Sequence, residues 1–190
     1  PRPRRRDVLR VGAGVAVGWL DASVDRVRDI IEGTHPSVAV SGRSLTAGRF
    51  KAARLHGGLD DPQFPGAHYH RGYELLVERS GRVVGDPPNA HAGSKRRRAV
   101  LVLRVGYLFG RDAPATGAGV GTSLWTPTIT GHNDADDIED ALTYPAFWGG
   151  SSIVGMVPAS DAETMVVIPQ QRALVVSRWE MTCSFAPGAS

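Results

Sequence analysis

The sequence has a single cysteine, few aromatic residues and no long apolar run. Because Cys183 has no second cysteine to pair with, an internal disulfide framework is excluded and a reducing compartment is indicated. Aromatic residues make up only 7% of the chain, and no stretch approaches the roughly 20 consecutive apolar residues that a membrane-spanning helix needs. We therefore expect neither a disulfide-stapled protein nor one that contacts a membrane.

What is present fits one globular domain. The 190 residues include 42% hydrophobic and 22% charged residues, enough for a sizeable buried core. The 23 glycines and 13 prolines punctuate the chain, which predicts short elements joined by long loops. We expect a basic, glycine-rich N-terminal arm over residues 1–18 and a single domain over residues 19–190.

Positive charge is concentrated in two blocks, although the formal net charge is only +3. One block lies in the arm and the other in a predicted loop; their members are Arg2, Arg4, Arg5 and Arg6, then Lys95, Arg96, Arg97 and Arg98. Contacts between such side chains and phosphates would make nucleic-acid binding salt-dependent without giving sequence specificity. No recognition helix or aromatic platform accompanies the blocks. We favour a solvated loop or a patch facing a partner subunit, with a nucleic-acid-binding module using segments 2–6 and 95–98 as the alternative.

The arm combines features of two familiar signals. Paired arginines followed by a mildly apolar stretch are typical of a twin-arginine export signal, but Gly12, Gly14 and Gly18 interrupt that stretch and no A-x-A site follows. The same glycines loosely resemble a dinucleotide-binding turn, but their spacing is off by one residue and no succession of strand and helix units follows. We expect a flexible arm or a small-residue packing surface, with no bound cofactor.

A helix opens the predicted domain. Apolar residues at spacings of three and four predict a helix over residues 19–32. Gly33 stands where a C-cap glycine belongs, and Pro36 follows shortly after. The following segments are less regular: a short strand is expected over residues 37–41, a weak helix or an irregular arm over 45–55, and a loop over 57–72.

Strands dominate the remainder of the chain. Residues 73–79 and 99–109 predict two strands, and apolar residues on both faces of the second place it centrally in a sheet or at a subunit contact. The long connection between them predicts an extended hairpin or a mobile loop. Further strands are predicted at IVGMV, at TMVVI and over residues 173–185. In the last of these, Cys183 falls on the apolar face and is expected to be a packed core residue. This order predicts an α+β fold, a mostly antiparallel β-sheet packed with two main helices.

The stretch GHNDADDIEDALT, residues 131–143, gathers most of the local negative charge. A narrow apolar stripe in it predicts a short surface helix. We interpret Asn133 as its N-cap and Asp134, Asp136 and Asp137 as first-turn residues, where the helix dipole favours negative charge by about 0.3–1 kcal/mol each. A metal site at His132, Asp134 and Asp136 would lack the ligand order of a calcium loop. The sequence therefore predicts that this stretch is structural.

No other motif supports an active site. His68 and His70 would need a third ligand to hold a transition metal, and none stands at a suitable spacing. Ser151 and Ser152 lack the glycine pattern of a nucleophile elbow, and the GSK triplet lacks the earlier glycine of a phosphate-binding loop. We therefore expect no catalytic residue, no cofactor, no metal and no enzymatic activity.

In the order and type of their helices and strands, these elements resemble the tail terminator (tail completion) proteins and related neck connector proteins of tailed bacteriophages. The resemblance covers residues 19–186. It is carried by the first helix, YELLVER, AVLVLRVGYLF, DADDIEDAL, TMVVIPQQ and ALVVSRWEMTCSF. The arginine-rich start, the insert-like stretch over residues 43–72 and two long loops exceed a minimal member of this group.

The resemblance implies a structural virion protein of the phage neck, assembled in the host cytoplasm. Such proteins form a closed ring, usually sixfold, that terminates the tail tube and docks the head-side connector. The implied partners are further copies of the chain, the tail tube protein and a head-completion or connector protein. The basic block at residues 95–98 would then lie at an interface or at the lumen, where DNA passes, and Arg4, Arg5 and Arg6 would make contacts from the arm.

Overall fold

The described residues form a five-stranded sheet covered on one face by two long helices. The computed structural model describes residues 18–37, 49–53, 58–61, 63–64, 66–83, 95–108, 125–167 and 172–185. Its strands are β1 (Lys51–Ala52), β2 (Gly72–Arg82), β3 (Lys95–Leu108), β4 (Ile153–Val167) and β5 (Arg172–Phe185). Its helices are α1 (Trp19–Gly33), α2 (Gly66–Tyr69) and α3 (Trp125–Thr143), followed by the 3₁₀ helix η2 (Pro145–Trp148).

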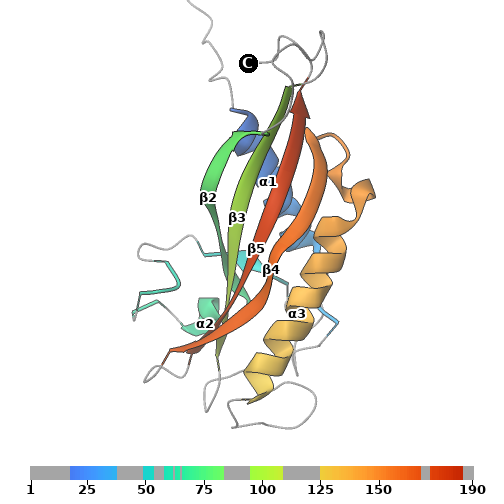
Figure 1. Cartoon of the computed structure of the whole chain (residues 1–190). Coiled ribbons are helices and arrows are strands. Elements are labelled where there is room, and N and C mark those ends of the chain that lie inside the picture. The colour runs from blue at the N-terminus through green and yellow to red at the C-terminus, as the bar shows by residue number, and fades with distance from the viewer. Residues whose placement is uncertain are drawn as a thin grey trace, which may run out of the picture.

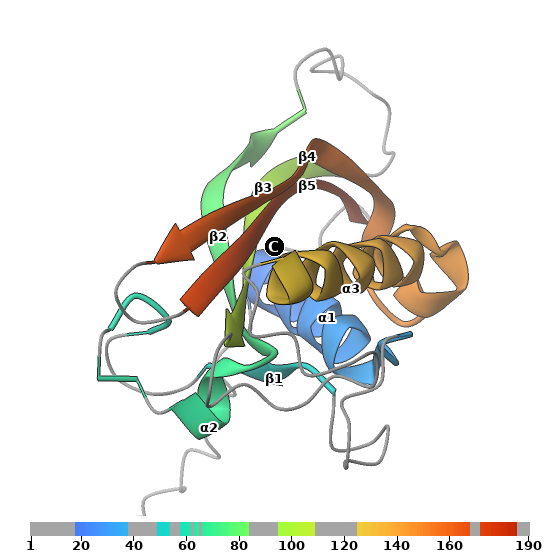
Figure 2. The ribbon, with the colours of Figure 1, turned by 90° about the horizontal axis from the view of Figure 1, so that it is seen from below.

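The strand order is β1-β2-β3-β5-β4, and every neighbouring pair is antiparallel except β1 with β2. This confirms the predicted α+β class and the central position of β3. Figure 2 shows α1 and α3 side by side on the same face of the sheet. Buried side chains from both helices and from β2 to β5 meet there in the main core, which includes Val27, Ile31, Leu101, Leu142 and Met181.

The predicted first helix is present, but it does not end as predicted. The helix continues through Gly33, whose φ is not positive, and Thr34 is the C-cap residue. The Thr34 N–H donates to the Ile31 carbonyl at 3.1 Å, and the Thr34 hydroxyl donates to the Ile30 carbonyl at 2.9 Å. These two hydrogen bonds satisfy carbonyls at the end of the helix, so no left-handed glycine is needed there. The C-cap prediction for Gly33 is therefore wrong.

A second apolar cluster covers the opposite face of the sheet at one end. It consists of Leu59, Phe64 and Tyr69 packed on Leu174 and Val176 of β5. Consequently β5 is buried on both faces over its first residues and alternates between buried and partly exposed residues only afterwards. Cys183 lies on its apolar face and is buried, as predicted.

The region before β2 differs from its predicted form. Residues 45–55, predicted as a weak helix or an irregular arm, include strand β1. The N–H of Ala53, the next residue after β1, donates to the Tyr73 carbonyl at 2.7 Å. The predicted loop over 57–72 contains α2. The predicted strand over 37–41 and the N-terminal arm lie almost wholly outside the described residues.

Two strands are longer than predicted. The hairpin of β2 and β3 is extended, as one of the two alternatives proposed, and pairs out to Arg82 opposite Arg97. The two segments IVGMV and TMVVI belong to one strand, β4, interrupted by register shifts around Pro158 and Ser160. Proline and bulges are typical of edge strands, which explains why the alternation in the sequence breaks although the strand continues.

Helix α3 begins well before the acidic stretch. It starts at Trp125, so Asn133 lies in the helix interior and its predicted role as N-cap is wrong. The predicted first-turn roles of Asp134, Asp136 and Asp137 are wrong for the same reason, and the Asp134 side chain is 0% exposed. The amphipathic pattern of the later residues was visible, whereas the first turns contain Gly131 and Pro127, which normally weaken a helix. Pro145 ends the helix by disfavouring the α conformation at Tyr144.

Asp134 and Arg71 form a buried ion pair. Arg71 is 2% exposed, and its Nε and Nη2 donate to the two carboxylate oxygens of Asp134 at 2.7 and 2.8 Å. The Tyr107 hydroxyl donates to the same carboxylate at 2.9 Å. Arg71 has a φ of 58°, a left-handed conformation that is uncommon outside glycine. This network connects the turn before β2 with β3 and α3.

Tyr69 gives a testable pH dependence. Burial raises the pKa of the Tyr69 hydroxyl to about 12, with the cation of Arg172 opposing that rise. Because the folded pKa exceeds the usual value near 10, the contribution to stability is complete below pH 10 and is lost as the pH rises toward 12. We expect urea midpoints to fall between pH 10 and 11.5, and to fall less in Tyr69→Phe. Equal losses in both proteins would contradict this role for Tyr69.

Candidate functional site

The basic block at residues 95–98 begins strand β3, and its predicted placement in a loop is wrong. Arg98 pairs with Gly81 of β2 on one side and with Thr182 of β5 on the other. The strand starts earlier than the apolar alternation suggested because its backbone pairs with β5 from Lys95 and with β2 from Arg97, and this pairing does not depend on apolar side chains. Alternating strand residues point to opposite faces, so Arg97 lies on the opposite face of the sheet from Arg96 and Arg98.

Two members of this block already have partners. The Arg97 guanidinium lies over the ring of Trp19, 5.6 Å from its centroid, and Trp19 packs edge-on against Phe185 at 5.5 Å. Arg98 forms an ion pair of 3.1 Å with Glu180. Arg96 is exposed and forms no ion pair with the described residues. Only part of the charge apparent in the sequence is therefore available to a polyanion.

Charge on the sheet face opposite α1 and α3 is largely compensated. Arg104 forms ion pairs with Glu74 and Asp60, and its hydrogen bond holds the pKa of Asp60 below its usual value. Arg178 lies 3.9 Å from Glu78. An ion pair as exposed as Arg178 with Glu78 contributes about 0–1 kcal/mol to stability. Such pairs therefore influence which surfaces meet more than how stable the domain is.

Both edges of the sheet carry exposed apolar side chains. Among the described residues, β1 pairs with β2 only at Gly72 and Tyr73, so β2 has no partner on that side from Glu74 onward. Strand β4 forms the other edge. About half of the side-chain surface is exposed at Leu76 and Val77 on β2 and at Val154 and Val157 on β4. Open edges with apolar side chains are surfaces on which a partner strand can add.

The residues considered as ligands or nucleophiles do not converge. His68 is exposed on α2, whereas His70 is half-buried with its ring edge-on to Tyr107 at 5.6 Å. Within the described ranges no three His, Cys, Asp or Glu side chains form a cluster suited to a metal. Burial raises the pKa of the Cys183 thiol, which lies 3.4 Å from the Ser23 hydroxyl. This arrangement suits packing rather than nucleophilic chemistry.

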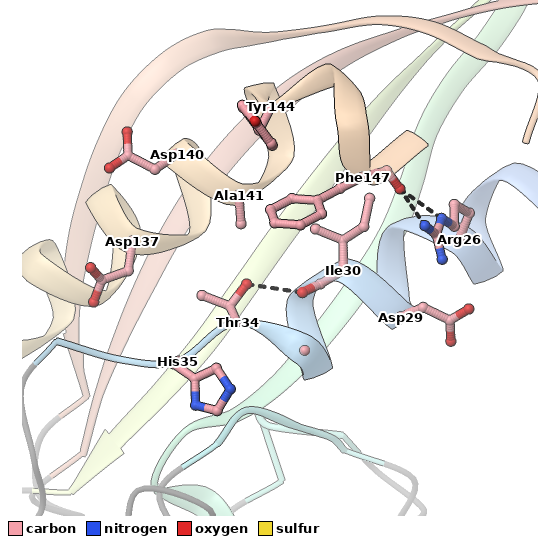
Figure 3. A pocket seen from close by; sticks show the side chains of 11 residues that line it. Arg26, Asp29, Ile30, Thr34, His35, Asp137, Asp140, Ala141, Tyr144 and Phe147 are labelled. Carbon is pink, nitrogen blue, oxygen red and sulfur yellow. Dashed lines mark hydrogen bonds between the residues drawn. The ribbon is translucent and has the colours of Figure 1, made fainter. Parts of the chain in front are cut away.

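The structure also reveals a groove between α1 and α3 that the sequence did not indicate (Figure 3). Its volume is about 460 Å³. Asp29 and Ile30 line it from α1, Asp140 and Ala141 line it from α3, and Phe147 lines it from η2. Only the relative placement of two helices 100 residues apart in the chain creates it, which the spacing within either helix cannot predict.

No known protein-family model and no curated protein matches this chain. No helix among the described residues is long and apolar enough to cross a membrane. The arginines at positions 4, 5 and 6 lie outside the described residues.

Proposed function

We propose that the protein is a structural component of a tailed-phage neck, which assembles as a closed ring that terminates the tail tube and joins it to the head connector. It acts by binding other proteins and has no enzymatic role. One observation carries the proposal: a single small domain exposes apolar side chains along both edges of its sheet. Such surfaces on a protein of this size mark contacts with other chains.

The two edges suit a ring because they are different surfaces. Closed rings use a head-to-tail interface, in which one surface of each subunit meets a different surface of the next. The β2 strand has one register shift, between Val77 and Arg79, whereas the β4 strand has three and contains Pro158. An interface between these unlike edges would pair β4 with the part of β2 that follows Tyr73, where no described strand adds to the sheet.

The basic start of β3 has a secondary role in this proposal. Arg96 is exposed at the end of the extended hairpin, where a lumen position would allow weak, sequence-independent contact with passing DNA. A nucleic-acid-binding module is the alternative function. It has less support because Arg97 contacts Trp19 and Arg98 pairs with Glu180, so both would have to give up these contacts.

Substitutions on the two edges test the proposal. We expect Leu76→Lys and Val157→Lys each to reduce self-association, because each places a charge in an apolar contact. Both side chains are about half exposed, so folding should persist, as urea unfolding would check. Glu139→Gln, an exposed change on α3 that alters the net charge by the same amount, is the matched control. Unchanged native mass in both edge variants would contradict a role for the edges.

A further inference from the structure

The groove between α1 and α3 has walls that are held in place without a ligand. The Arg26 Nε donates to the Phe147 carbonyl at 2.8 Å, which fixes η2 against α1 (Figure 3). At the other end, the Ser37 N–H donates to the Asp137 carboxylate at 2.6 Å, which fixes the chain after α1 against α3. Preformed concave surfaces of this kind lose little entropy when they bind.

Acidic side chains outnumber basic ones in the groove, and two aromatic rings lie beside them: the lining includes Asp29, Asp137 and Asp140, Arg26 and His35, and Tyr144 and Phe147. Asp29 and Asp140 are exposed and form no ion pair with the described residues. The rings of Tyr144 and Phe147 are 56% and 46% exposed and pack edge-on at 5.2 Å. Carboxylates beside exposed aromatic rings match arginine, whose guanidinium pairs with carboxylates and stacks on aromatic faces. The groove therefore suits an arginine-rich segment.

The chain has only one arginine-rich segment available for this role. The block over residues 95–98 begins β3: Arg97 and Arg98 pair with both neighbouring strands, and Lys95 and Arg96 pair with β5, so this segment is held in the sheet and cannot enter a groove. The other block comprises Arg2, Arg4, Arg5 and Arg6. We propose that the groove binds the arginine-rich segment 2–6 of a second copy of the chain, an inference that rests on the proposed ring and names one of its contacts.

The positions of arm and groove favour contact between copies. The arm joins α1 at Gly18, whereas the groove is lined by the C-terminal half of α1, from Arg26 to Gly33. The attachment point of the arm and the groove thus lie toward opposite ends of one helix, and a head-to-tail contact joins two such different surfaces. From Arg6 to Gly18 the extended chain spans about 40 Å, nearly twice the roughly 22 Å of α1. That length is sufficient to reach a neighbouring subunit as well as the groove of the same chain, and mixing labelled with unlabelled protein distinguishes the two contacts.

Crosslinking in the full-length protein tests this contact. A photoreactive residue replaces Pro3, which keeps every arginine, and unlabelled protein is mixed with ¹⁵N-labelled protein before irradiation. We expect crosslinks from the arm to peptides containing Asp29 or Asp140, joining light to heavy chains. Crosslinks confined to one chain, or to other surfaces, would overturn the proposal.

Exchanging the charges on the two surfaces provides a second, independent test. Asp29→Lys with Asp140→Lys should lower the yield of the intermolecular crosslink on the order of tenfold, as should Arg4→Glu with Arg5→Glu. Combining all four changes should restore it. The matched control, Asp136→Lys with Glu139→Lys, changes exposed residues of α3 that do not line the groove and should leave the yield unchanged. No rescue would overturn the charge pairing.

The outcome separates this inference from the proposed function. Closed rings without the groove crosslink would overturn the arm contact and leave the ring function standing. The groove crosslink between copies that form only open chains or dimers would support the arm contact and contradict the ring.

Discussion

Replacing Asp134 with alanine is expected to lower the free energy of unfolding by about 3–5 kcal/mol, because it would leave a charged arginine buried without its partner. Arg71 is 2% exposed and donates two hydrogen bonds to the Asp134 carboxylate. The Tyr107 hydroxyl would lose its acceptor as well. Arg71 also adopts a left-handed backbone conformation, which costs energy that these contacts offset.

The matched control is Asp136→Ala. Asp136 is exposed on the same helix, so its replacement should change the free energy of unfolding by about 0.5 kcal/mol or less. Urea unfolding monitored by circular dichroism measures both variants. Equal, small losses in the two proteins would mean that the ion pair between Arg71 and Asp134 does not contribute to stability.

Replacing Gly106 with valine is expected to cost about 2–3 kcal/mol through overpacking. A Cβ at this position would lie 2.7 Å from the Tyr69 carbonyl oxygen and 2.9 Å from Tyr69 Cε1. The carbonyl belongs to the backbone of α2, and the Gly106 carbonyl itself accepts from the Arg71 N–H at 2.8 Å. The two segments therefore cannot separate without losing hydrogen bonds, and the clash must displace α2.

Gly81→Val on the neighbouring strand is the control for this substitution. No heavy atom lies within 4 Å of a Cβ placed at Gly81. Valine there should leave stability unchanged or raise it, because it reduces the entropy of the unfolded chain and suits a strand. Unfolding midpoints in urea measure the pair. A Gly106→Val protein as stable as Gly81→Val would show that Tyr69 does not pack on β3 as described.

The parts of the fold that the sequence predicted are those determined by local periodicity. The apolar spacing in α1 and the alternation in β3 and β5 identified these elements and the α+β class. Element ends were predicted less well, because they depend on contacts distant in the chain. The pairing of Arg98 with both neighbours extends β3, and the cap of α1 is a threonine rather than the glycine beside it.

Burial of charge was the main feature that local patterns could not reveal. Asp134 stands among exposed acidic residues in the sequence, and its burial depends on Arg71, which lies 63 positions away. A single sequence gives no sign that these two residues meet. For the same reason the sequence does not predict the groove between α1 and α3, and it predicts a loop at residues 95–98, where the structure has the start of β3.

Native mass spectrometry combined with negative-stain imaging of the purified full-length protein tests the central claim most directly. The measurement is made over a range of protein concentrations, with and without magnesium. The proposed function predicts a closed cyclic oligomer with an open centre, whose population rises with concentration and falls in the edge variants Leu76→Lys and Val157→Lys. A strict monomer under every condition would contradict assembly of a ring by this chain alone.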